Sequence, residues 1–281
     1  MIEVLRTIEG IRRWRRQAGG TVGLVPTMGA LHEGHLSLVR AAQQKADRSV
    51  VSVFVNPLQF GANEDLSAYP RNFDRDLALL KSAGAEAVFY PSVEEMYPRG
   101  QSVTRVSVGA MGQVLCGRTR PIHFDGVATV VMKLFHIVQP DFAFFGEKDW
   151  QQLAVIRRMV DDLNVPVTVV GVPTVRDANG LALSSRNQYL SPSEHGAATN
   201  LSQALQAGKR RFDAGERDRE AIRQTIGEWL QTAGLNPEYV ELVDPDSLET
   251  APQVLDRPTV AALAVRIGRA RLIDNIMLGR N

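Results

Sequence analysis

The sequence contains one cysteine, few aromatic residues and no hydrophobic run long enough to cross a membrane. Cys116 has no second cysteine to pair with, so an intrachain disulfide is excluded, as is typical of proteins from a reducing compartment. The longest apolar stretch, residues 127–138, is interrupted by Lys133 and His136 and is too short for a bilayer span. The first residues include no apolar segment of the secretory type. We therefore expect a cytoplasmic protein.

An excess of charge of either sign is also missing. The 32 basic and 31 acidic residues leave a formal net charge of +1, which gives no general attraction to nucleic acids or anionic membranes. Four arginines cluster within residues 12–16, but Ile8, Ile11 and Trp14 recur through this segment at helical spacing. This pattern favours the basic face of an amphipathic helix over an RNA-binding arm.

Several common motifs of nucleotide sites and covalent catalysis are absent. The sequence has no G-x-x-x-x-G-K-[ST] phosphate loop, no G-x-G-x-x-G after a strand and no G-x-S-x-G elbow. Because no covalent nucleophile stands out either, any catalysis would depend on positioning and on neutralisation of charge.

Apolar runs alternate with amphipathic stretches over residues 1–175, which we expect to form the first domain. The apolar runs are continuous, as in a parallel sheet that is covered on both faces. The pattern predicts a Rossmann-like, doubly wound α/β domain whose ligand crevice lies at the carboxyl ends of the strands. We expect strands at residues 21–25, 50–55, 87–90, 141–145 and 167–171, and helices at 36–46, 73–83, 127–138 and 150–163.

The pattern changes in residues 176–281. Two long helical stretches, residues 192–214 and 219–233, come first, and strand-like runs follow them. Helices followed by strands predict a smaller α+β domain, which we expect to form a lid over the active site. The strand-like runs cover residues 239–243, 260–267 and 272–277.

Residues 27–35 form the most informative segment, between a strand that Pro26 is expected to close and a helix from Leu36. A glycine-bearing turn that leads into a helix N-terminus favours an anion. His32 and His35 lie three residues apart in it and can donate hydrogen bonds to phosphate oxygens. We predict a triphosphate site. A zinc site is a weaker alternative, since the spacing is not His-Glu-x-x-His, and histidines that merely pack or cap the helix are another.

Polar residues follow two other expected strands. Asn56 and Gln59 carry neutral amides that suit a substrate with hydroxyl and carboxylate groups, although such residues also form ordinary turns. After the strand that ends near Gly146, Lys148 at a helix N-terminus is unfavourable with the helix dipole unless an anion binds there.

The helix that begins near Lys148 offers two further polar groups. Asp149 is either an N-cap or a ligand of Mg²⁺ on a phosphate, directly or through water. Gln152, one turn into the helix, is expected to point toward the same crevice as Gln59.

Two loops supply further cationic and donor groups. Arg120 and His123 belong to a basic loop for which simple solvation is an equal alternative. Ser184, Ser185 and Arg186 open the second domain and suit phosphate oxygens, which predicts a flap that closes over a nucleotide.

Together these motifs strongly resemble the pantothenate synthetase (pantoate–β-alanine ligase) family along essentially the whole chain. The His-x-Gly-His element alone would indicate only the wider nucleotidyltransferase superfamily. The resemblance is carried by residues 26–35 (PTMGALHEGH), 54–60 (FVNPLQF), 145–152 (FGEKDWQQ), 184–187 (SSRN) and 271–276 (RLIDNI).

The resemblance implies an activity and its partners. Members of the family condense pantoate with β-alanine, using ATP and Mg²⁺, and release AMP and pyrophosphate through a pantoyl adenylate. They are typically cytoplasmic homodimers. The substrates would then be small molecules only, with neither nucleic acid nor a membrane as a partner.

The resemblance also implies roles for individual residues. His32, His35, Lys148 and Arg186 would be catalytic, and Gln59, Gln152, Asn56, Arg120 and His123 would bind pantoate or β-alanine. Asp149 would lie on the ribose or magnesium side. The ATP-binding residues would be Met28, Gly29, His32, His35, Gly146, Lys148, Asp149, Val175, Leu183, Ser184, Ser185 and Arg186.

The sequence departs from the family at two positions. Leu183 stands where methionine is usual, and Trp150 stands where a smaller aromatic residue is common. Both keep an apolar side chain, so the resemblance leaves only the detailed packing around the nucleotide undefined. Two other functions compete with the ligase: another transferase of the superfamily that acts on a phosphorylated small molecule, and a non-catalytic nucleotide- or RNA-binding protein.

Overall fold

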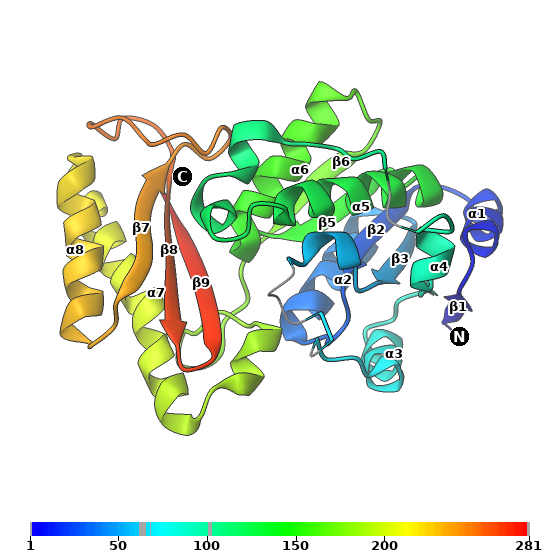
Figure 1. The fold of residues 1–281 in the computed structure, drawn as a ribbon, viewed down its shortest axis with the longest axis horizontal. Coiled ribbons are helices and arrows are strands. Elements are labelled where there is room, and N and C mark those ends of the chain that lie inside the picture. Colours follow the sequence, from blue (N-terminus) through cyan, green and yellow to red (C-terminus); the bar gives the residue numbers. More distant parts are fainter. Residues whose placement is uncertain (1, 62–65, 68, 101–102, 280–281) are drawn as a thin grey trace. The chain divides into compact units, whose positions relative to one another are not determined.

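The computed structural model describes residues 2–61, 66–67, 69–100 and 103–279. The chain divides into two compact units, drawn in the colours of the sequence in Figure 1. The first unit consists of Met1–Glu147 and Val155–Pro173, and the second of Lys148–Ala154 and Thr174–Asn281. The chain therefore passes between the units three times: between Glu147 and Lys148, inside helix α6 after Ala154, and after Pro173.

A parallel sheet forms the centre of the first unit, as the continuous apolar runs predicted. Within the described residues its six strands follow the order β1-β4-β3-β2-β5-β6. The edge strand β1 was not predicted, because three residues are too few to show a pattern. The strands are β1 (Glu3–Leu5), β2 (Val22–Thr27), β3 (Arg48–Val53), β4 (Ala87–Phe89), β5 (Phe142–Gly146) and β6 (Thr168–Val172).

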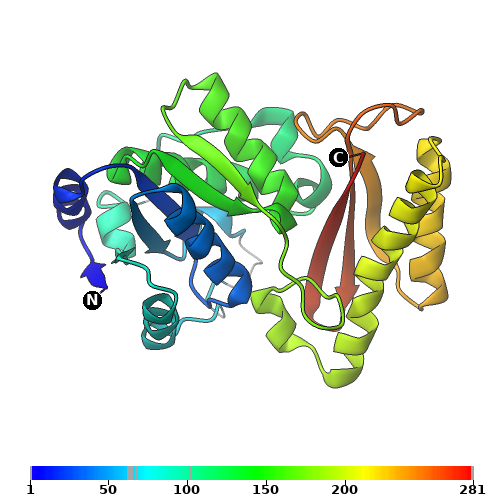
Figure 2. The same cartoon turned by 180° about the vertical axis from the view of Figure 1, so that it is seen from behind.

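Helices cover both faces of this sheet. Helices α2 and α3 pack on one face with Val25, Val51 and Val88, whereas α5 lies over the other face (Figures 1 and 2). Successive strand residues point to opposite faces, so a strand buried on both sides must be apolar throughout. The helices of this part of the chain are α1 (Ile8–Gln17), α2 (Glu33–Lys45), α3 (Phe73–Ser82), α4 (Val93–Met96), α5 (His123–Val138) and α6 (Trp150–Asp162).

The expectation that Pro26 closes its strand is wrong, because β2 continues through Pro26 to Thr27. Proline has no N–H to donate to a neighbouring strand. The pairing of β2 with β5 ends at Leu24, whereas the pairing with β3 continues to Thr27. The carbonyl oxygen of Thr27 accepts from the N–H of Phe54, on the β3 side. Because backbone groups of successive strand residues point to opposite neighbours, those of Pro26 point toward β5, from which β2 has already separated. The missing N–H therefore removes no ladder hydrogen bond.

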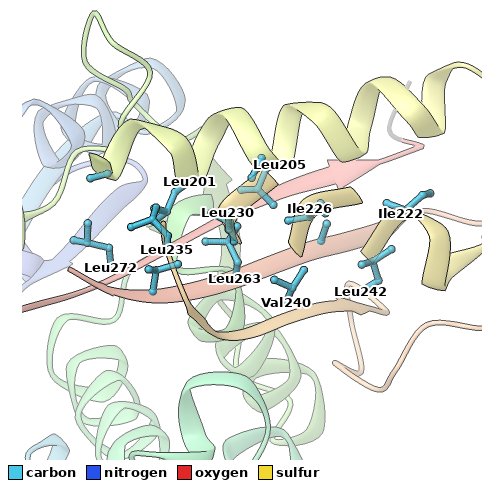
Figure 3. Close-up of a cluster of buried hydrophobic side chains, with 14 of the residues drawn as sticks. Leu201, Leu205, Ile222, Ile226, Leu230, Leu235, Val240, Leu242, Leu263 and Leu272 are labelled. Atoms are coloured by element: carbon cyan, nitrogen blue, oxygen red, sulfur yellow. The ribbon is translucent and has the colours of Figure 1, made fainter. Parts of the chain in front are cut away.

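The second unit is an α+β structure, as predicted. Helices α7 (Pro192–Asp213) and α8 (Arg219–Thr232) pack against an antiparallel sheet of order β7-β8-β9. Figure 3 shows their shared apolar core, which joins Leu201 of α7, Ile226 of α8 and Leu263 of the sheet. The strands are β7 (Pro237–Val243), β8 (Thr259–Ile267) and β9 (Ala270–Leu278).

Local sequence signals fix where these two helices begin. Ser191 and Glu194 form a reciprocal capping box at the start of α7, in which each side chain accepts from the other residue's backbone N–H. Asp218 caps α8 by accepting from the N–H of Ala221 at 2.7 Å. Among the described residues no helix is long and apolar enough to span a bilayer.

Helix α7 contains two glycines in opposite surroundings, and we expect their substitution by alanine to have opposite effects. A Cβ added at Gly208 would lie 2.6 Å from Cγ1 of Ile226 in α8, whereas one added at Gly196 meets nothing within 4 Å. Gly196→Ala should raise the free energy of unfolding by about 0.5–1 kcal/mol through helix propensity. Gly208→Ala should lower it, because overpacking costs about 1–3 kcal/mol. Urea denaturation of the full chain measures both, and equal stabilisation by the two variants would show that α7 and α8 do not pack closely at Gly208.

Candidate active site

The topology of the first unit brings three of the predicted segments to one edge of the sheet. From β2 the connections run through β3 to β4 on one side, and on the other side β5 leads to β6, so the direction of winding changes between β2 and β5. In open α/β sheets ligands bind at the carboxyl ends of the strands beside such a switch point. The turn at Met28 follows β2 and the segment from Asn56 to Gln59 follows β3, and Gly146 is the last residue of β5 at that edge.

The turn after β2 is held by a buried carboxylate that the sequence analysis did not identify. Asp76 of α3 is 1% exposed, and its two oxygens accept from the N–H groups of Ala30 at 2.9 Å and Leu31 at 2.8 Å. Gly29 has φ +83°, and a Cβ there would lie 2.9 Å from Oδ2 of Asp76. The turn therefore needs both a glycine and an acceptor. The available signal was an aspartate on the apolar side of an amphipathic helix, four residues before Leu80.

His32 and His35 form the N-terminus of α2, which begins at Glu33, three residues earlier than predicted. Nδ1 of His32 accepts from the N–H of Gly34 at 3.2 Å, and Nδ1 of His35 accepts from the N–H of His32 at 3.4 Å. The capping role considered for these histidines is therefore present. An acceptor Nδ1 places the proton of a neutral ring on Nε2. In both capped rings the neutral form therefore carries its proton on Nε2, and an N–H of this kind can donate to an anion.

Asn56 and Gln59 are buried side chains, not surface turn residues. They are 1% and 6% exposed, and they flank a short 3₁₀ helix, η1 (Pro57–Gln59). Nε2 of Gln59 donates to Sδ of Met28 at 2.9 Å, which joins the amide segment to the turn after β2. Helix α5 approaches closely at Gly126, where a Cβ would lie 2.6 Å from Cα of Gln59.

Arg120 and His123 both contact the backbone carbonyl of Gln59. Nδ1 of His123 lies 2.9 Å from that oxygen, and Nη2 of Arg120 lies 3.5 Å from it. Nη1 of Arg120 is 3.1 Å from Nε2 of His123. Because a carbonyl only accepts and a guanidinium only donates, His123 carries its proton on Nδ1. The basic loop is therefore attached to the amide segment rather than simply solvated.

A cavity of about 320 Å³ in the first unit borders the turn through Met28 and Gly29. Its other lining residues are Arg6 after β1 and residues from β3 and just after it, from α3 and the segment before it, and from the segment after β4. None of His32, His35, Asn56 and Gln59 is among them. The cavity therefore does not coincide with the crevice predicted at the switch point.

Lys148 of the second unit is held through its backbone. It lies in a 3₁₀ turn directly before α6, and its carbonyl accepts from Nδ2 of Asn275 in β9 at 2.8 Å. Its Nζ lies 3.6 Å from Oδ1 of Asp149. Trp150 is buried, and its indole N–H donates to the carbonyl of Pro245 at 2.9 Å. Gln152 is half-buried in the first turn of α6.

The predicted ATP-binding residues after β6 are also brought together. The N–H of Leu183 donates to the carbonyl of Val175 at 2.9 Å, and the Ser184 hydroxyl accepts from the N–H of Arg186 at 3.2 Å. Ser185 begins the 3₁₀ helix η5 (Ser185–Tyr189), and the Arg186 side chain is exposed.

Strand β9 ties both parts of the second unit's site together. Arg176 makes two hydrogen bonds, of 2.6 and 2.9 Å, to the carboxylate of Asp274, which is 2% exposed. Asp274 precedes Asn275, the residue that holds Lys148. The segment at residues 271–276 was part of the family resemblance, but no role was predicted for it. The structure shows that two consecutive residues anchor the lysine turn and the Val175–Leu183 segment.

These features define the protein's class. A parallel α/β sheet with donor side chains at a helix N-terminus beside its switch point is typical of enzymes that bind nucleotides. Buried amides beside the turn add neutral donors and acceptors that suit a small polar acid.

Comparison with known proteins identifies the family. The family of pantoate–β-alanine ligases matches residues 3–277. The pantothenate synthetase of Moorella thermoacetica is 51% identical over 287 residues, with 100% of both chains covered. That of Heliobacterium modesticaldum is 53% identical over 279 residues, with 99% of both covered. The chain belongs to the pantoate–β-alanine ligase family.

Solved structures agree with this assignment. Pantothenate synthetase from Thermus thermophilus has a TM-score of 0.92 and 46% identity, with 98% of both chains covered. Pantoate–β-alanine ligase from Francisella tularensis, complexed with β-γ ATP and β-alanine, has a TM-score of 0.80 and 32% identity over 100% of this chain and 99% of its own.

Tyr97 makes the stability of the first unit depend on pH at the alkaline end. Burial raises the pKa of Tyr97 above its usual value of about 10. The folded chain therefore keeps this proton at a pH where the unfolded chain loses it, so the contribution to stability is complete below pH about 10 and declines above it.

We expect the free energy of unfolding to fall more steeply between pH about 9.5 and 11 in the unmodified protein than in Tyr97→Phe. Urea denaturation across this range measures both slopes. Lys133, whose Nζ lies 5.2 Å from the Tyr97 ring centroid, is present in both proteins. Equal slopes would mean that Tyr97 ionises normally in the folded protein.

Proposed function

We propose that this chain condenses pantoate with β-alanine in two steps. The pantoate carboxylate attacks the α-phosphorus of ATP to give pantoyl adenylate and pyrophosphate. The amine of β-alanine then attacks the acyl carbon, loses a proton and displaces AMP. The full-length match to the ligase family carries this proposal, and the relative from Francisella tularensis that binds β-γ ATP and β-alanine supports it.

We assign the ATP phosphates to the histidines of the first unit and to basic residues of the second. The capping bonds at Nδ1 put the proton of each neutral ring on Nε2, and we assign this N–H of His32 and His35 to the phosphates. Lys148 and Arg186 supply positive charge against the leaving pyrophosphate, where charge develops in the transition state. Met28, Gly29, Gly146, Val175 and Leu183 are assigned to the rest of the nucleotide.

Pantoate is assigned to Gln59 and Gln152, whose amides can orient its carboxylate for in-line attack. Asn56, predicted beside them, bonds to Gln59 with its own amide and supports this pocket from behind. The contacts of Arg120 and His123 with the Gln59 carbonyl support a role in fixing this pocket, beside the substrate contact expected of them. Ser184, Ser185 and Arg186 are assigned to a lid, formed by the second unit, that keeps water from the mixed anhydride.

Magnesium fits this site as an ion carried by ATP. Asp149 offers one half-exposed carboxylate next to Lys148, and the described residues contain no cluster of three His, Cys, Asp or Glu side chains that could form a resident cage. Mg²⁺ is commonly held by one or two carboxylates together with phosphate oxygens and water. Bound with ATP, it would neutralise phosphate charge, with Asp149 as its protein ligand directly or through water.

A homodimer and a cytoplasmic location, both implied by the family resemblance, remain predictions. The competing RNA-binding function loses support, because Arg15 of the arginine cluster pairs with Asp141 at 3.2 Å and with the carbonyl of Gln139 at 2.9 Å. A transferase that acts on a phosphorylated substrate would not require amides at both Gln59 and Gln152.

Exchange of labelled pyrophosphate into ATP tests the first step. With Mg²⁺ present and β-alanine absent, we expect exchange only when pantoate is added, because the adenylate forms reversibly from ATP and pantoate alone. Exchange without pantoate would indicate a different acceptor. Absence of exchange in folded protein, both with and without pantoate, would reject the proposed reaction.

Two single substitutions separate the two binding roles. Lys148→Ala should lower turnover by about 10²–10³ and leave stability nearly unchanged, since Asn275 holds the backbone of Lys148 and not its side chain. Gln59→Ala should raise KM for pantoate more than KM for ATP. Steady-state kinetics on both variants and on His35→Ala, with thermal unfolding as a control, measures these effects. Equal loss of both affinities in Gln59→Ala would remove Gln59 from the acid pocket.

A further inference from the structure

We propose that Tyr97 is a positioning residue for pantoate: it fixes the amide orientation of Gln59 through Asn56. This inference rests on the proposed function, since it assigns a task to the pocket that holds the acid. Tyr97 belongs to none of the motifs that carry the family resemblance, and it lies 38 residues after Gln59 in the sequence (97 − 59).

Tyr97 reaches Asn56 from a different part of the first unit. It follows the short helix α4 and is 7% exposed, and its hydroxyl lies 2.8 Å from Oδ1 of Asn56. An amide oxygen only accepts, so the tyrosine donates. Burial raises the pKa of Tyr97 above its usual value, so the hydroxyl keeps this proton at neutral pH.

The backbone independently supports this orientation of Asn56. Nδ2 of Asn56 donates to the carbonyl of Gly126 at 3.0 Å, and Oδ1 accepts from the N–H of Leu58 at 3.3 Å. A flipped amide would set its oxygen against the Gly126 carbonyl and its NH₂ group against the N–H of Leu58. Asn56 therefore has one good orientation, and the Tyr97 hydroxyl makes the shortest of its hydrogen bonds.

Asn56 passes this orientation to Gln59. Its Nδ2 also donates to Oε1 of Gln59 at 3.3 Å, which turns Nε2 of Gln59 toward Sδ of Met28 at 2.9 Å. Nε2 carries two hydrogens, and the sulfur accepts one of them. We assign the other to a pantoate oxygen. With the opposite orientation Gln59 would present an acceptor, which repels a carboxylate.

Packing of the tyrosine ring is a separate role. The Phe54 ring lies 6.1 Å from the Tyr97 ring between centroids, and Nζ of Lys133 lies 5.2 Å from the same ring. Tyr97→Phe keeps the ring and removes only the hydroxyl. Lys133→Met removes the cation over the ring and keeps the hydroxyl. These two variants separate hydrogen bonding from packing.

We expect Tyr97→Phe to raise KM for pantoate about 3- to 10-fold, the range that follows from loss of one buried neutral hydrogen bond. KM for ATP should stay within about 2-fold in Tyr97→Phe, because this change does not touch the phosphate donors. Lys133→Met should leave both KM values unchanged, because it keeps the Tyr97 hydroxyl and its hydrogen bond. Thermal unfolding checks that both variants are folded. Parallel rises in the two KM values, or an equal effect of Lys133→Met, would show that the residue acts through packing alone.

A double-mutant cycle with Gln59→Ala tests the route through Gln59. If Tyr97 acts through this amide, Tyr97→Phe should cause no further rise in KM for pantoate once Gln59 is alanine. An additive rise would overturn the proposal. Pantoate-dependent pyrophosphate exchange by the unmodified protein is measured first. Its failure rejects the proposed function, whereas normal exchange with an additive cycle rejects only the role of Tyr97.

Discussion

The predicted phosphate site depends on a buried carboxylate that accepts two backbone hydrogen bonds. Asp76 holds the N–H groups of Ala30 and Leu31, both in the turn that places His32 at the start of α2. Burial of a carboxylate is costly unless it is hydrogen-bonded, and these N–H groups would otherwise lack a partner. The same interaction therefore satisfies two needs and fixes where the helix begins. The positive φ of Ala30 and Gly29 follows from this arrangement.

Each unit positions its polar side chains by contacts from elements remote in sequence. In the first unit α3 holds the histidine turn, and Tyr97 and α5 hold the amide segment. In the second unit consecutive residues of β9 hold the Lys148 turn and Arg176. The proposed chemistry needs donors at fixed positions, and such positions require side chains whose partners belong to rigid elements. This need explains why Asn56, Gln59 and Asp76 are buried although they are polar.

Local patterns in the sequence predicted the sheet apart from β1, its parallel direction and the helices apart from the short α4, because continuous apolar runs and helical periodicity are local signals. They also placed the histidine turn, the amides and Lys148 at strand ends. Asp76, Tyr97 and Asn275 were missed, because each acts on a residue 41 to 127 positions away. No local periodicity reports such a contact. Pro26 shows the same limit, because its tolerance inside β2 depends on where the neighbouring strand β5 separates from β2.

Trp150, one of two departures from the family pattern, has a structural explanation. Its indole N–H donates to the carbonyl of Pro245, directly after β7, and its ring is buried. Phenylalanine lacks this donor, and tyrosine carries its hydroxyl at a different point of the ring. Helix α6 begins two residues after Lys148, so this hydrogen bond adds a second anchor beside Asn275. The tryptophan therefore helps to hold the lysine turn in place through its hydrogen bond to Pro245 and its buried ring. This role does not require contact with the nucleotide.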